Sequence, residues 1–120
     1  MVTASDTVEG PAAPDGGLRI DVGDEPGGAV LAFVGDLDLA GVPAAEGAIH
    51  DALARPGDVT IDLSRLEFIG SEGIRVVLRA RERAGAQGRA LRVVPGEGAA
   101  RRLIEILGLA DQLGVEGDPR

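Results

Sequence analysis

The residues of this chain whose types and spacing suit chemistry are Asp36, Asp38, Ser71 and Glu72. Ser71 stands just before a stretch of helical periodicity, where the first helix amides and the helix dipole favour an anion. Its hydroxyl is therefore a good acceptor for a phosphoryl group. The same hydroxyl could instead cap the helix, and spacing alone favours the cap. The two aspartates lie on one side of an extended segment and could serve acid–base chemistry or hold Mg²⁺.

A phosphate on Ser71 is expected to meet acidic neighbours. It carries about 1.5 to 2 negative charges at neutral pH. A pair of unit charges about 7 Å apart repels by about 2 kcal/mol at an effective dielectric constant near 20. A helix N-terminus contributes only about 0.3 to 1 kcal/mol in the opposite direction. Phosphorylation should therefore strain the loop and raise its density of negative charge.

The remaining candidates for chemistry are weaker. Acids that follow a strand usually cap the next helix or stay solvated, so we expect neither metal binding nor catalysis at Asp36 and Asp38. His50 lies on a polar helical face without a Ser or Cys partner, which is typical of a surface residue. Residues 96–101 imitate a dinucleotide-binding fingerprint, but Arg101 replaces its third Gly or Ala. We expect no catalytic residue, no metal site and no cofactor.

Composition excludes several classes of protein. The 120 residues include 20 Asp and Glu against 12 basic residues, a net charge of -8, with 2% aromatic residues, so nucleic acid is an unsuitable partner. No Cys is present, which excludes disulfides and thiolate metal sites. Every basic residue is Arg, which excludes a Walker-type lysine. The apolar runs are too short to span a membrane and no secretory signal is seen, so we expect a cytoplasmic protein.

Hydrophobic periodicity outlines one domain. Alternating and continuous apolar runs predict strands at residues 18–22, 29–34, 58–63 and 90–94, the second of them covered on both faces. Helical spacing predicts helices at residues 42–53, 74–84 and 100–107, with loops at residues 35–38 and 64–70. We expect a disordered tail over residues 1–17, a domain over residues 18–116 and a C-terminal tail over residues 117–120.

The chain's last third carries three finer signals. Arg81 falls inside the apolar stripe of its helix and is expected to extend its charge to solvent near the helix end. Gly108 predicts a Schellman ending that brings Leu109 against Ile104. Residues 113–115 could add a short final strand.

Alternation of strands and helices predicts an α/β fold. It has a mixed, largely parallel sheet of four to five strands, one of them antiparallel, and about three to four helices. Partners and ligands of such sheets meet the loops beyond the carboxyl ends of the strands. If the second and third strands are neighbours, the loop of Asp36 and Asp38 opens beside the loop of Ser71 and Glu72.

Two stretches resemble the signature of STAS domains, a module shared by anti-sigma factor antagonists and sulphate transporters. Residues 59–74 are similar to a family strand that ends in Asp-Leu-Ser and leads to an Asp-Ser-Ser-Gly-Leu loop opening a helix. Residues 35–38 look like the family's Gly-Glu-Leu-Asp loop, and residues 95–109 resemble its last helix. The likeness covers about residues 18–115 and implies a STAS-like fold.

The resemblance implies a bacterial transcription regulator rather than an enzyme. In such antagonists a kinase, itself the anti-sigma factor, phosphorylates the first Ser of the loop. The unphosphorylated form binds this kinase and frees the sigma factor. Ser71 matches the phosphoacceptor and Asp38 the acid that faces the partner. The implied partners are an anti-sigma factor serine kinase and a phosphatase, with no nucleic acid or membrane. The protein would be a monomer or weak dimer with a partner surface of Asp36, Asp38, Gly70, Ser71, Glu72, Gly73 and Arg75.

Two departures from the family pattern keep alternatives open. Gly70 replaces the usual Asp, which would weaken kinase recognition, and Glu72 replaces Ser or Thr, which would partly imitate the phosphorylated state. One alternative is a STAS scaffold or accessory subunit of a signalling or transport complex that is not phosphorylated. Another is a nucleotide-dependent enzyme with Mg²⁺ on Asp36 and Asp38, which the lack of Lys and of a nearby His disfavours.

Overall fold

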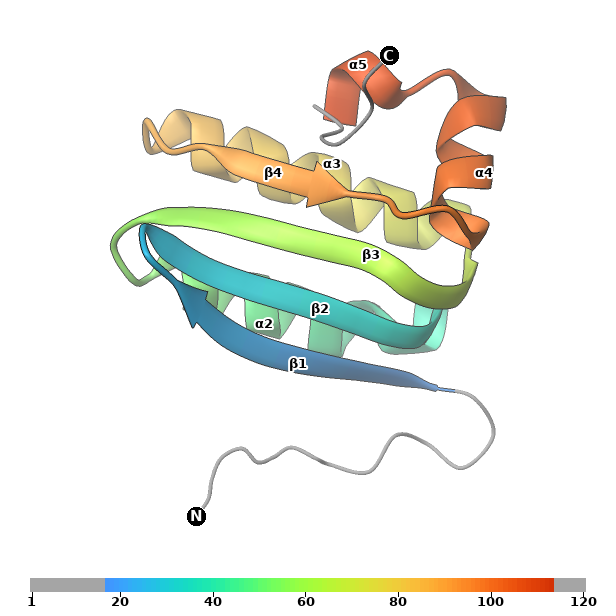
Figure 1. The fold of residues 1–120 in the computed structure, drawn as a ribbon, viewed down its shortest axis with the longest axis horizontal. Coiled ribbons are helices and arrows are strands. Elements are labelled where there is room, and N and C mark those ends of the chain that lie inside the picture. Colours follow the sequence, from blue (N-terminus) through green and yellow to red (C-terminus); the bar gives the residue numbers. More distant parts are fainter. Residues whose placement is uncertain (1–16, 114–120) are drawn as a thin grey trace.

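The computed structural model describes residues 17–113 and is shown in Figure 1. The predicted N-terminal tail, apart from Gly17, and the predicted C-terminal tail lie outside the described residues. The elements follow in the order β1 (Leu18–Glu25), β2 (Gly28–Leu37), the 3₁₀ helix η1 (Leu39–Gly41), α2 (Val42–Leu53), β3 (Asp58–Ile69), α3 (Ser71–Ala86), β4 (Leu91–Val94), α4 (Ala99–Leu107) and α5 (Ala110–Leu113).

The described strands form one mixed sheet in the order β1-β2-β3-β4. β1 and β2 pair antiparallel, while β2, β3 and β4 run parallel and are joined by crossover helices. The antiparallel pair turns at Gly27, whose φ of 126° lies in the region that glycine adopts at low cost. The predicted α/β fold with a largely parallel sheet is confirmed, with four strands and helices α2 to α5 over residues 17–113.

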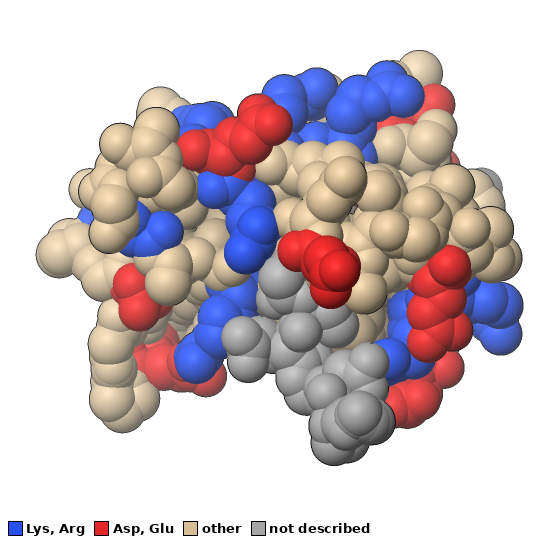
Figure 2. Space-filling model, turned by 90° about the horizontal axis from the view of Figure 1, so that it is seen from above, with Lys and Arg blue, Asp and Glu red and all other residues tan. Residues whose placement is uncertain are grey.

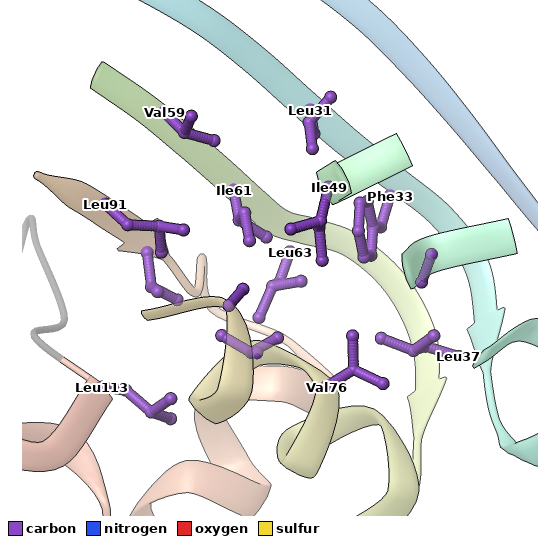
Figure 3. Close-up of a cluster of buried hydrophobic side chains, with 14 of the residues drawn as sticks. Leu31, Phe33, Leu37, Ile49, Val59, Ile61, Leu63, Val76, Leu91 and Leu113 are labelled. Atoms are coloured by element: carbon purple, nitrogen blue, oxygen red, sulfur yellow. The ribbon is translucent and has the colours of Figure 1, made fainter. Parts of the chain in front are cut away.

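The core lies between one face of the sheet and the helices. Figure 3 shows Leu31, Phe33, Ile61 and Leu63 of the central strands directed toward side chains of the helices. Each of these side chains is at most 1% exposed, and burial of such a side chain contributes about 1.5 to 3 kcal/mol. In Figure 1, α2 lies behind β1 and β2 and α3 lies behind β4, and buried side chains of both helices belong to the core.

Among residues 17–113, no helix lies over the other face of β1 and β2 (Figure 1). Val30 and Val34 of β2 point to this face and are half-buried. Beside them, Asp21 of β1 pairs with Arg19 at 3.1 Å and with Arg65 at 3.9 Å. The prediction that this strand is covered on both faces is therefore wrong for the second face at Val30 and Val34, where apolar residues and long arginine stems share a partly exposed surface.

Both central strands run further than their sequence pattern predicts. β2 includes Asp36 and Leu37, and β3 continues through Leu66 to Ile69, so the predicted loops at residues 35–38 and 64–70 are largely strand. The pairing of β2 with β3 shifts register between Ala32 and Val34 and again between Gly35 and Asp36. Such bulges break the period-two alternation, which is why the pattern suggested that the strands ended earlier.

The end of the described chain is helical. Leu109 N donates to Ile104 O at 3.0 Å and Gly108 N to Glu105 O at 3.1 Å, which confirms the predicted Schellman motif. The predicted final strand is wrong at Leu113, which closes helix α5 and is buried in the core, while Val115 lies outside the described residues.

Arg81 does more than extend its charge to solvent. Its Nη1 donates to the backbone carbonyl of Gln112 at 2.8 Å, so this side chain ties α5 to α3. Its Nε is buried and has no hydrogen bond within residues 17–113.

Every helix described over residues 17–113 is too short or too polar to cross a membrane.

Candidate functional site

The carboxyl ends of β2 and β3 lie side by side, as the topology predicts. Leu37 pairs with Ile69 in the parallel register. Beyond them, Gly70 N donates to Leu37 O at 3.1 Å and fixes the start of α3 to the end of β2. The loop of Asp38 and the helix start with Ser71 therefore share one edge of the sheet.

Ser71 is the first residue of α3, not its cap. The N-cap is Gly70, in extended conformation with φ −100° and ψ 179°, and its carbonyl accepts the amides of Gly73 at 3.0 Å and Ile74 at 3.1 Å. No side chain of the described residues caps this helix, so the cap that spacing favours for Ser71 is not formed. Its side chain is exposed. The hydroxyl is thus open to solvent beside first-turn amides that have no acceptor within their own helix.

Glu72 folds back over Gly70. Its Oε1 lies 2.9 Å from the position that a Cβ at residue 70 would take. Within the described part of the chain its carboxylate has no ion pair. A negative charge therefore stands next to Ser71 at the positive end of the helix dipole, where it is favoured by a few tenths of a kcal/mol to about 1 kcal/mol.

Gly73 seats the helix start on the strand ends. A Cβ at this residue would lie 2.7 Å from Leu37 Cγ and 2.9 Å from Ile69 Cγ1, closer than packed carbon atoms allow. Arg75, two residues further along α3, is exposed and forms no ion pair with any residue from 17 to 113. Gly73 thus allows the start of α3 to pack closely on the ends of β2 and β3, while Arg75 lies on the exposed surface of α3.

Asp36 and Asp38 line the same hollow at the end of β2. It is open, has a volume of about 390 Å³ and is also lined by Gly17, Leu18, Ala40, Gly41 and Ala44. Leu37 between them points into the core and is fully buried. Over residues 17–113, no group of three or more His, Cys, Asp or Glu is arranged to hold a metal ion.

Two exposed apolar residues at this edge were not among the predicted site residues. Phe68, next to the end of β3, is 51% exposed, and Leu39, just after β2, is 68% exposed. Phe68 pairs with Asp36 in the sheet register, so the two side chains point to the same face. Residue type did not reveal this exposure, because aromatic residues at strand ends are commonly buried.

The other candidates have structural surroundings. His50 is exposed, as predicted, with Nδ1 3.3 Å from Arg83 Nη2. In the fingerprint-like segment, a Cβ at Gly96 would lie 2.4 Å from Ser64 Cβ, and Arg101 Nε donates to Gly96 O at 2.6 Å. These contacts explain its glycine and arginine by packing against β3. Figure 2 shows acidic and basic side chains interleaved on the face that it presents.

Comparisons with known proteins agree with the fold. The family model described as Mlab, STAS domain, matches residues 20–115. The anti-sigma-F factor antagonist RsfB of Mycobacterium tuberculosis is 37% identical over 99 residues, which cover 82% of this chain and 80% of RsfB. The crystal structure of an anti-sigma factor antagonist from Mycobacterium paratuberculosis has a TM-score of 0.77 at 33% identity, covering 90% of this chain and 92% of that one.

A more distant structure shares the fold alone. The anti-sigma factor antagonist SpoIIAA in its unphosphorylated form has a TM-score of 0.67 at 17% identity, covering 83% of this chain and 90% of SpoIIAA. The phosphorylated form of SpoIIAA, from Bacillus, has a TM-score of 0.63.

Proposed function

The chain belongs to the STAS domain family, among its anti-sigma factor antagonists, and we propose that phosphorylation of Ser71 controls its binding to an anti-sigma factor. The unphosphorylated form binds the anti-sigma factor, a serine kinase, and thereby releases a sigma factor in the bacterial cytoplasm. The 37% identity to RsfB, which its name makes an antagonist of the anti-sigma-F factor, supports this assignment. The protein then acts by binding, as a monomer or weak dimer, and catalyses no reaction.

The observation that carries the proposal is the state of the Ser71 hydroxyl. It is exposed at the first position of α3, and no capping bond within residues 17–113 occupies it. A hydroxyl used as a cap would have to leave its helix amide before a kinase could modify it. This one is available for transfer without loss of a helix contact.

The surroundings of Ser71 give the phosphate its effect. The carboxylate of Glu72, the next residue in the chain, folds back over Gly70, and Asp36 and Asp38 stand at the end of the neighbouring strand. A phosphoryl group would add about 1.5 to 2 negative charges to this acidic edge. A partner shaped to cover a neutral hydroxyl would then have to remove water from a highly charged group, which is costly. Binding should fall on phosphorylation.

The partner surface extends over both loops. The proposed contact residues are Asp36, Asp38, Gly70, Ser71, Glu72 and Arg75, whose positions are exposed or partly exposed. Gly73 is buried, so its part in binding is to hold the helix start in place.

The proposal is tested by phosphorylation with the cognate anti-sigma factor kinase and ATP, followed by tryptic mass spectrometry. Cleavage after Arg65 and Arg75 gives a peptide of residues 66–75 in which Ser71 carries the sole hydroxyl. Thr60 and Ser64 fall in another peptide. We expect phosphate on residues 66–75, its loss in Ser71→Ala, and its removal by a partner phosphatase. Phosphate elsewhere, or on no peptide, contradicts the proposal.

Binding gives the second test. An ATP-binding kinase captured from native extract should prefer wild type and Ser71→Ala over Ser71→Asp.

A second candidate function is a scaffold or accessory subunit that is never phosphorylated. The observation that favours it is the pairing of Gly70 with Glu72, which leaves a permanent carboxylate beside Ser71. Ser71→Ala separates the two functions in cells. Unchanged partner binding with unchanged regulation supports the scaffold, whereas a sigma factor that stays released supports the switch.

A further inference from the structure

The two phenylalanines of the chain are in opposite environments. Phe33 of β2 is fully buried in the core, whereas Phe68 of β3 is 51% exposed. An aromatic ring that could be buried gives up a large part of its hydrophobic stabilisation when it stays in water. Phe68 stands three residues before Ser71, at the same edge of the sheet. Such a ring is suited to be buried by a partner.

Acidic groups surround this ring. Phe68 Cε2 and Glu72 Oε1 lie 3.6 Å and 2.9 Å from the position of a Cβ on Gly70, so ring and carboxylate are close neighbours. Asp36 is the register partner of Phe68 on β2 and points to the same face. An apolar centre with a charged rim is the usual anatomy of a protein–protein contact.

We propose that Phe68 is the apolar anchor of the antagonist on its anti-sigma factor, and that its ring enters an apolar pocket with a basic rim. This inference rests on the proposed function. A kinase that reaches the Ser71 hydroxyl must also cover Phe68, because both belong to one short segment at the strand end. The basic rim of the pocket meets the carboxylates of Asp36 and Glu72.

A second copy of this chain fits the same surface poorly. A two-fold dimer would bring the patch against itself and set the carboxylates of Asp36 and Glu72 opposite like groups. Like charges brought together at an interface are costly, and the chain already carries a net charge of -8. The charge pattern therefore favours a basic partner.

The test compares Phe68→Ala and Phe68→Leu with a matched control. Val22→Ala removes an apolar side chain that is 58% exposed, on β1 and outside the proposed contact. The probe is the purified anti-sigma factor of the anti-sigma-F class from the source organism, and affinity is measured by titration calorimetry. Because Phe68 is half exposed, its variants should keep the fold, which circular dichroism checks.

We expect Phe68→Ala to weaken binding by about 30-fold or more, the fold-change of a hot-spot residue. Phe68→Leu should weaken it by less, and Val22→Ala by less than about 2-fold. If Phe68→Ala binds within about 2-fold of wild type while Ser71→Asp still abolishes binding, the anchoring role of Phe68 is wrong but the control of binding by Ser71 stands. Self-association lost in Phe68→Ala without loss of anti-sigma factor binding also overturns the anchoring role. Wild type that does not bind this probe overturns the switch and the anchor together.

Discussion

The two edges of the sheet use their polar groups in opposite ways. At the amino ends of the parallel strands, the Arg89 guanidinium donates to Gln87 and to three backbone carbonyls at and just after the end of α2, those of Leu53, Arg55 and Gly57. At the carboxyl ends, the side chains of Ser71 and Glu72 have no such bonds to the described residues. The amino edge is fastened by this side chain, whereas at the carboxyl ends of β2 and β3 the side chains of Ser71 and Glu72 are presented to solvent.

The difference separates the polar groups that stabilise the fold from those that are available for binding. A buried or fastened polar group is costly to remove, because its former partners lose a hydrogen bond. An exposed polar group without partners costs little to replace, and its chemistry is free for binding. Substitutions at the amino edge should therefore lower stability, and surface substitutions at the carboxyl edge should alter binding alone.

The largest expected effect is that of Arg89→Ala. Three backbone carbonyls lose a charged donor, and we expect the free energy of unfolding to fall by about 2–3 kcal/mol. Urea unfolding followed by circular dichroism measures it, since the chain has neither Trp nor Tyr for fluorescence. The control is Arg75→Ala at the other edge, which should leave stability within about 0.5 kcal/mol of wild type. Equal losses from both variants would contradict the comparison.

Below the surface of the carboxyl edge, Gly73 is packed tightly, so a substitution there should lower stability. Gly73→Ala places a methyl group 2.7 Å from Leu37 Cγ and 2.9 Å from Ile69 Cγ1, so the strand ends or the helix start must move. Overpacking of this kind costs about 1–3 kcal/mol. We expect a loss near 2 kcal/mol in urea unfolding. A neutral result would mean that the helix start is not held against the strand ends.

Gly85→Ala is the matched substitution at the other end of α3. Apart from its chain neighbours and its own helix backbone, no atom of residues 17–113 lies within 4 Å of a Cβ at this residue, and the helix propensity of Ala exceeds that of Gly. We expect the free energy of unfolding to rise by about 0.5–1 kcal/mol, measured in the same urea series. A loss of stability in this variant would show that the open end of α3 is packed after all.

The sequence predicted the part of the fold that depends on regular periodicity. The continuous apolar run of residues 29–34 predicts the first part of β2, and the alternation of Ile61 and Leu63 with polar residues predicts the first part of β3; both are confirmed. Their far ends were missed because bulges shift the pairing, so that buried residues such as Leu66 and Ile69 stand three apart rather than two. That spacing is not a strand pattern.

Of the candidate site, the sequence likewise predicts only the part that depends on the order of the strands. The meeting of the two loops follows from the order of parallel strands, which sequence can predict. The cap assignment failed by one residue, because Gly70 adopts an extended conformation that residues of any type can adopt. The bonds of Arg89 to Leu53 and Gly57 join residues more than 30 apart in the chain, which no local pattern encodes.

The smallest expected effect tests the open edge most directly. Replacement of a helix-capping serine by Ala lowers the free energy of unfolding by about 0.5–2 kcal/mol. Ser71 makes no capping bond within the described residues. We therefore expect Ser71→Ala to change the free energy of unfolding by less than about 0.5 kcal/mol in urea, as a surface substitution does. A loss near 1 kcal/mol would restore the cap and remove the main support for a free acceptor.

Gly70→Ser completes this test, because it puts a hydroxyl on the residue that does cap α3. The new Cβ meets only the flexible end of Glu72 within 3 Å, and that carboxylate can turn away. A side-chain cap in place of Gly stabilises a helix by a few tenths of a kcal/mol. A gain for Gly70→Ser with no loss for Ser71→Ala would assign capping to residue 70 alone. The Ser71 hydroxyl would then make no contact that stabilises the fold, so its phosphorylation and dephosphorylation could proceed without loss of a helix cap.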